Sequence, residues 1–257
     1  EGFDARLLAA AVQAENQSVI HIARDDMRLD AMHTALKFFA PEIPVFTFPA
    51  WDCLPFDRIS PNADVSAARM AVLATLAAGF DRPFIFLTTI NGATQRVPAK
   101  SVLKSASFTA EVGRQIDDKE LRNFFARMGF VQAPTVTEPG DFAVRGGLID
   151  VYPPGEIGPV RLDLFGDVLD GARRFDAATQ RTTEKLDRLE LAPVSEVILD
   201  EPSIQRFRQN YRIEFGAAGT DDPLYEAVSA GRKHQGIEHW APFFHEHMDT
   251  LFDYLPD

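Results

Sequence analysis

The stretch GDFAVRGGLIDVYPPGEIGPVRLDLFGDVLDGARRFD, residues 140–176, decides the fold of the middle of the chain. Apolar and polar residues alternate on both sides of two short turn signals, the strong Gly146-Gly147 and the weaker Gly166-Asp167. Glycine suits the positive backbone angles that two-residue hairpin turns require. The sequence therefore predicts two successive β-hairpins.

Strand alternation assigns each side chain of these hairpins to one face of the sheet. A two-residue turn pairs Arg145 with Leu148 and Val144 with Ile149. One face is then apolar and forms a core, consisting of Phe142, Val144, Ile149, Val151, Val160, Leu162 and Leu164. The other face is predicted to meet solvent and carries Arg145, Leu148, Asp150, Tyr152, Arg161, Asp163 and Phe165.

Two arginines and a phenylalanine on a solvent-facing sheet surface indicate a docking site, because Arg and large aromatics anchor protein interfaces. The guanidiniums of Arg145 and Arg161 are suited to bidentate pairing with carboxylates of a partner. The alternative is a solvated surface on which Phe165 merely covers a strand end, since scattered exposed apolar residues are common. Because the three side chains point away from the core, we expect their replacement to leave the fold intact. The facing of Arg174 depends on whether Gly171 forms a bulge, which the sequence leaves open.

Length and composition describe an ordinary globular protein of two or three units, with 257 residues, 46% hydrophobic and 25% charged. The net charge of −12 argues against non-specific binding of nucleic acid, which needs clustered Lys and Arg. One cysteine, Cys53, excludes an internal disulfide and fits a reducing cytosol. No apolar run reaches the ~18 residues of a membrane span, and no signal peptide is visible. The chain begins at Glu1 without a methionine, so we expect it to be a segment of a longer protein.

The first hundred residues follow an α/β pattern. Strands are predicted at residues 18–23, 45–48 and 83–89, and helices between them at residues 26–39 and 64–76. This alternation predicts a parallel sheet with right-handed crossovers. Such a sheet often binds a nucleotide, but the required phosphate loop, G-x-x-x-x-G-K-[ST], is missing from the sequence. We therefore expect no ATP site.

The middle of the chain is predicted to be a compact α+β domain over residues 106–193. A short helix at residues 117–128 packs on an antiparallel sheet, which the hairpins and a last strand at residues 185–191 complete. From residue 201 the pattern is helical again, and the aromatic, irregular end of the chain must pack on another part of the protein.

Catalytic and metal-binding patterns are missing from the sequence. The four histidines near the end are not spaced as in H-E-x-x-H, the zinc-peptidase motif; they are His234, His239, His245 and His247. No G-x-S-x-G elbow is present. Cys53 has no obvious histidine partner and is expected to be packed rather than nucleophilic.

The order of several motifs resembles the UvrB-like N-terminal region of the bacterial transcription-repair coupling factor family (Mfd). The matching stretches are FPAWDCLPFDRISPNADVSAARMAVL (residues 48–73), TTINGATQRVP (88–98), GDFAVRGGLIDVYPPG (140–155), VRLDLFGD (160–167), RRFD (173–176), ATQRT (178–182), GIEHW (236–240) and LFDYLPD (251–257). Together they cover nearly the whole chain.

This resemblance implies three parts. Residues 1–105 and 194–257 form a degenerate RecA-like (P-loop NTPase-like) domain, and residues 106–193 are an inserted α+β domain that binds UvrA. Family members bind UvrA through two arginines and a phenylalanine on the exposed sheet face. The corresponding residues here are Arg145, Arg161 and Phe165, with Arg174 as a further candidate.

The resemblance also implies a cytoplasmic bacterial repair protein whose ATP- and magnesium-dependent DNA translocase lies outside this chain. An autoinhibitory C-terminal domain would mask the UvrA-binding face, and other domains would provide most contacts with RNA polymerase and DNA. This segment itself would be non-catalytic and bind no cofactor.

Two other functions are weighed against this one. One is a UvrB-type ATP-dependent protein that binds damaged DNA; the missing phosphate loop disfavours it, as do residues 54–68, which are short and lack tyrosine where UvrB has a tyrosine-rich hairpin. The other is a purely structural domain that shields the motor.

Overall fold

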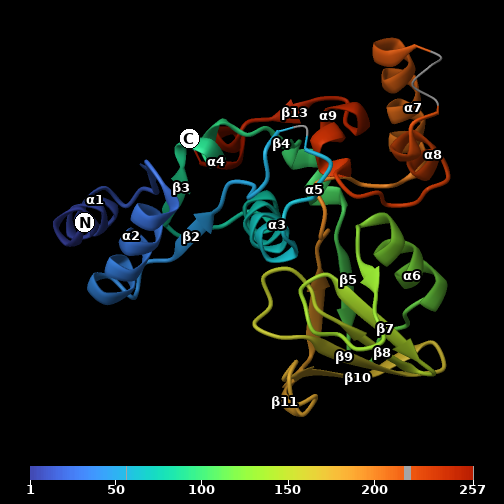
Figure 1. Cartoon of the computed structure of the whole chain (residues 1–257). Coiled ribbons are helices and arrows are strands. Elements are labelled where there is room, and N and C mark those ends of the chain that lie inside the picture. The colour runs from blue at the N-terminus through green and yellow to red at the C-terminus, as the bar shows by residue number, and fades with distance from the viewer. Residues whose placement is uncertain (56, 217–220, 257) are drawn as a thin grey trace.

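The computed structural model describes residues 1–55, 57–216 and 221–256. Parallel and antiparallel sheets both occur, which confirms a mixed α/β protein. In Figure 1 an N-terminal α/β region lies at the left, an antiparallel-sheet region at the lower right and a C-terminal helical region above that sheet.

The N-terminal region is built on a small parallel sheet, as predicted, and its strand order is β1-β3-β2. The strands are β1 (Val19–Ala23), β2 (Val45–Phe48) and β3 (Ile85–Thr89). All five residues of β3 are buried, because helices cover both faces of the sheet. Such double coverage explains why apolar residues follow one another without alternation at Ile85, Phe86 and Leu87.

Helices α1 (Gly2–Glu15) and α2 (Asp26–Phe39) cover one face of the sheet, and α3 (Ala63–Ala78) covers the other. Helix α2 begins where the sequence predicts, because the Asp25 carboxylate accepts a hydrogen bond from the Arg28 amide at 3.0 Å. Helix α1 was not predicted from the sequence. Beyond β3 follow α4 (Ile90–Thr94), β4 (Val97–Pro98) and α5 (Lys100–Ser105).

The antiparallel-sheet region contains a six-stranded sheet of order β11-β10-β9-β8-β7-β6. Its strands are β6 (Val131–Gln132), β7 (Asp141–Arg145), β8 (Leu148–Val151), β9 (Val160–Phe165), β10 (Val168–Phe175) and β11 (Thr182–Leu186). Helix α6 (Asp118–Arg127) packs on the apolar face. Both hairpins are confirmed, since Arg145 pairs with Leu148 and Phe165 with Val168.

The predicted strand at residues 185–191 is wrong in one respect. It divides at Asp187 into the end of β11 and a separate β12 (Arg188–Leu191), which pairs with β5 (Phe108–Glu111) in a two-stranded sheet. Leu186 and Leu189 both pack in the same core, yet a spacing of three places them on opposite sides of a continuous strand. A break between them lets both side chains face inward.

The end of the chain packs in two places. Helices α7 (Glu201–Phe215), α8 (Pro223–Ser229) and α9 (Ala241–Phe244), together with the short η2 (Ile237–Trp240), enclose an aromatic core. The last residues then return to the N-terminal region. There β13 (Met248–Asp249) pairs with β4, and η3 (Leu251–Tyr254) adds Leu251 and Tyr254 to the core beneath α3. The expectation that this aromatic end packs on another part of the protein is confirmed.

A buried ion pair joins α3 to the segment that leaves the sheet region. Arg69 is fully buried, and its Nε lies 2.6 Å from the Glu196 carboxylate. The Trp51 indole also donates to Glu196 at 3.0 Å, while Arg69 donates to the Gln95 side chain at 2.8 Å. The Arg69 guanidinium thus donates to acceptors on separate segments and links residues that are far apart in the sequence.

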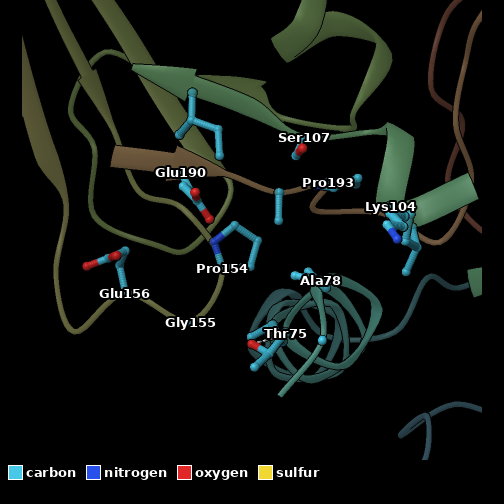
Figure 2. Close-up of a pocket in the computed structure, with 15 residues that line it drawn as sticks. Thr75, Ala78, Lys104, Ser107, Pro154, Gly155, Glu156, Glu190 and Pro193 are labelled. Atoms are coloured by element: carbon cyan, nitrogen blue, oxygen red, sulfur yellow. Dashed lines mark hydrogen bonds between the residues drawn. The ribbon is translucent and has the colours of Figure 1, made fainter. Parts of the chain in front are cut away.

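A cavity of about 360 Å³ lies at the seam between α3, α5, the loop at residues 154–156 and β12 (Figure 2). Two of its polar side chains are engaged by the protein itself. The Thr75 hydroxyl donates to the Ala71 carbonyl at 2.8 Å, and Glu156 forms an ion pair with Arg174 at 2.6 Å. The cavity is therefore better explained as a gap between packed regions than as a ligand site.

Candidate protein-docking face

The three residues singled out in the sequence share one face of the sheet, on the side opposite α6. Arg145 ends β7, while Arg161 and Phe165 lie four residues apart on β9. Phe165 is 83% exposed, and the side chains of Arg145 and Arg161 are 50% and 25% exposed. Their shared surface, with the neighbouring side chains of β8 and β10, is called the docking face below.

Asp150 fixes both arginines of the docking face. It lies directly opposite Arg161 across β8 and β9, and its two oxygens accept from Arg161 Nε at 2.7 Å and Nη2 at 2.8 Å. Arg145 Nη1 lies 3.7 Å from the same carboxylate. The hydrogen bonds that Arg161 donates to Asp150 raise the pKa of Arg161, so this guanidinium stays charged.

The expectation that this whole face meets solvent is wrong at Asp150, which is buried. Both arginines, Arg145 and Arg161, contact its carboxylate. A small apolar cluster of Val136, Ala143 and Phe175 lies on the same side of the sheet. The Arg161 guanidinium packs over the Phe175 ring at 4.9 Å, a favourable cation–π contact.

Arg145 is held from a second direction by the chain that follows β6. Its Nη2 donates to the Pro134 carbonyl, in addition to the ion pair with Asp150. Phe165, by contrast, extends from the tip of the second hairpin without covering neighbours, as its exposure shows. The docking face thus combines two positioned cations with one exposed apolar side chain.

A β-bulge in β10 determines on which face of the sheet each of its two arginines lies. Leu169 pairs with Leu164, but Gly171 pairs with Asp163, so Asp170 is one extra residue. The shift places Arg173 opposite Arg161 and Arg174 opposite the buried Val160. Arg174 therefore lies on the other side of the sheet from the docking face.

The partners of Arg174 agree with that position, since it forms ion pairs with Glu156 and Glu184. This geometry does not support Arg174 as a fourth residue of the docking face. The sequence analysis did not place Arg173 on the docking face. Uninterrupted pairing of β9 with β10 does not bring Arg173 opposite Arg161; the extra residue of the bulge does.

The cysteine and histidines considered in the sequence lie elsewhere. His239 Nε2 is 3.8 Å from Cys53 Sγ, a neighbour that the sequence did not reveal. Burial raises the pKa of the Cys53 thiol, which opposes formation of the reactive thiolate. His245 is buried, with Nε2 donating to the Glu196 carbonyl at 2.8 Å.

Residues 1–55, 57–216 and 221–256 contain no group of three or more His, Cys, Asp or Glu side chains placed to hold a metal ion. Their helices include none with the length and apolar character needed to cross a bilayer.

Comparison with known proteins assigns the sheet region to a class of domain. Residues 108–197, which include all strands of the docking face, match the UvrB interaction domain family. Over its full length the chain is similar to transcription-repair-coupling factors, with 32% identity to that of Haemophilus influenzae over 257 residues and 31% to that of Escherichia coli over 256 residues. The resemblance drawn from the sequence motifs is thereby confirmed.

These alignments cover 100% and 98% of this chain but only 22% of each relative. The protein of Myxococcus xanthus shows 31% identity with the same partial coverage, 98% of this chain and 22% of the relative. The chain therefore corresponds to about a fifth of the length of these relatives.

Proposed function

We propose that this chain is a non-catalytic, UvrB-like module that binds UvrA through the docking face. Within a transcription-repair-coupling factor of the bacterial cytoplasm, it would recruit excision repair to lesions where RNA polymerase has stalled. The observation that carries the proposal is the exposed Phe165 beside two arginines held by a buried carboxylate, in a region that matches the UvrB interaction domain family.

The contributions of the three residues differ. Phe165 offers the largest exposed apolar surface of the face and acts as the anchor that enters a pocket of the partner. Arg145 is half exposed and able to reach a carboxylate of the partner. Arg161 uses its Nε and Nη2 for Asp150, so it presents Nη1 rather than the bidentate edge that the sequence suggested.

The remaining parts of the proposal concern the longer protein. Residues 1–105 and 194–257 together form a degenerate RecA-like domain around the insert at 106–193; the pairing of β13 with β4 supports this return of the chain. ATP hydrolysis and DNA translocation belong to a motor outside this chain, and other domains supply most contacts with DNA and RNA polymerase. An autoinhibitory C-terminal domain masks the docking face until repair begins.

The direct test measures binding of purified UvrA to the chain and to single variants. Phe165→Ala is expected to weaken binding about thirtyfold, since loss of a hot-spot residue costs roughly 2 kcal/mol or more. Ile157→Ala is the matched control, because Ile157 is 84% exposed in the same domain but lies in the loop before β9. Equal binding of the parent and Phe165→Ala would place the docking site elsewhere.

Arg145→Ala has its own control in Arg122→Ala. Arg122 is similarly exposed and paired with a carboxylate, but it lies on α6, away from the docking face. We expect Arg145→Ala to lose affinity for UvrA and Arg122→Ala to retain it. The reverse result would move the interface to the helical side of the domain.

A further inference from the structure

Three cations lie directly opposite one another across the last three strands of the sheet. Arg161 of β9 pairs in register with Arg173 of β10, which pairs with Lys185 of β11. All three are on the side of the sheet away from the apolar core, since their strand neighbours Leu162, Ala172 and Leu186 pack in that core. We call Arg161, Arg173 and Lys185 the cationic row.

Such a row is unfavourable for the isolated protein, because like charges directly opposite in a sheet destabilise it. Carboxylates of the chain neutralise the cationic row only in part. Arg161 is paired with Asp150, and Asp163 lies 4.0 Å from Arg173. Among the described residues, Lys185 has no carboxylate within 4.0 Å.

The cationic row stands out because acidic side chains outnumber basic ones in this chain. The protein carries 38 acidic and 26 basic side chains, yet three adjacent strands here each present a cation at the same level. A lysine on an edge strand such as β11 also serves to block sheet-to-sheet association. That explanation does not extend to Arg173, which lies on the interior strand β10 with its side chain 45% exposed.

We propose that the docking face extends along the cationic row to the β11 edge and binds an acidic surface of the protein partner through Arg173 and Lys185. This inference rests on the proposed function. The apolar Phe165, two residues from Asp163 and at the same sheet surface, favours a protein over a nucleic acid.

The test uses the double variant Arg173→Ala/Lys185→Ala, with Arg122→Ala/Lys119→Ala on α6 as the matched control. Association with UvrA is measured at low and high salt, about 0.05 M and 0.5 M. We expect the row variant to bind UvrA about tenfold more slowly at low salt, with the difference shrinking at high salt. The control should follow the parent at both concentrations.

Thermal unfolding of the row variant gives a second readout. Its melting temperature should equal or exceed that of the parent, because repulsion within the row is relieved. A row variant that unfolds earlier would show that Arg173 and Lys185 stabilise the sheet, and the inference would be overturned.

The binding outcomes separate the two proposals. If the row variant binds UvrA like the parent while Phe165→Ala does not, the docking face ends at Phe165 and only this inference fails. If Phe165→Ala also binds normally, the proposed function fails with it. If the row variant loses affinity for a short labelled DNA duplex but not for UvrA, the row is a nucleic-acid surface and the inference is again overturned.

Discussion

Arg161 and Asp150 form a two-point ion pair across β8 and β9, with Nε to Oδ1 at 2.7 Å and Nη2 to Oδ2 at 2.8 Å. The carboxylate is buried, while the Arg161 side chain as a whole is 25% exposed. One arginine thus belongs to the docking face and also neutralises a buried charge. This dual position has consequences for mutagenesis of the face.

Arg161→Ala is expected to lower the free energy of unfolding by about 1–3 kcal/mol, because it leaves the buried Asp150 without its closest partner. Phe165→Ala should change it by no more than about 0.5 kcal/mol, as its side chain is exposed. Urea unfolding of both variants measures the difference. The expectation from the sequence, that these residues are dispensable for the fold, holds only if both variants are as stable as the parent.

Gly147→Ala is expected to destabilise the first hairpin by about 1–3 kcal/mol, the usual range for overpacking. A Cβ at Gly147 would lie 2.6 Å from the Leu164 carbonyl oxygen, which is backbone of the neighbouring β9. Gly166→Asn is the control, since a Cβ there meets open space and Asn tolerates its φ of 66°. Melting temperatures of the two variants decide whether this close approach constrains the sheet.

Arg69→Met is expected to cost about 3–5 kcal/mol, because it strands the buried carboxylate of Glu196. Adding Glu196→Gln should recover part of this loss, since the remaining side chain is neutral and still accepts from Trp51. Denaturant unfolding of the single and double variants tests the pair. A single variant within 1 kcal/mol of the parent would show that the ion pair is not an important link between the regions.

Acid should destabilise the protein partly through His245. Burial lowers the pKa of this imidazole below its ordinary value of 6.5, so the folded protein keeps it neutral while the unfolded chain takes up a proton. Its contribution is therefore present above about pH 6.5 and is lost as the pH falls below that value. His33, whose pKa burial also lowers, acts in the same direction.

His245→Gln isolates the effect of that residue, because the amide retains a donor for the Glu196 carbonyl. We expect the melting temperature of this variant to fall less steeply than that of the parent between about pH 7 and pH 5.5. His247→Gln, at an exposed position, is the control. Identical slopes for the parent and His245→Gln would exclude His245 as the source.

ATP with magnesium is expected to leave the melting temperature unchanged, since the sequence has no phosphate loop. A ligand at a hundred times its dissociation constant would stabilise the folded state by about 2.7 kcal/mol. A clear upward shift in a thermal scan would contradict the prediction. It would also revive the UvrB-type alternative, in which nucleotide drives DNA binding.

The sequence alone determined the local features of the fold. Turn residues and strict alternation set both hairpins, their register and the shared face of Arg145, Arg161 and Phe165, because strand periodicity depends only on near neighbours. Capping residues likewise set the starts of the helices, as at Asp25 and Asp117.

Only the tertiary structure decided which of these residues are free and which are engaged. The extra residue in β10 exchanges Arg174 for Arg173 on the docking face, since a bulge depends on packing against neighbouring strands. Burial of Asp150 beneath its arginines follows from side chains gathered from three strands. The pairing of Arg69 with Glu196 joins positions 127 residues apart, a distance over which sequence periodicity carries no information.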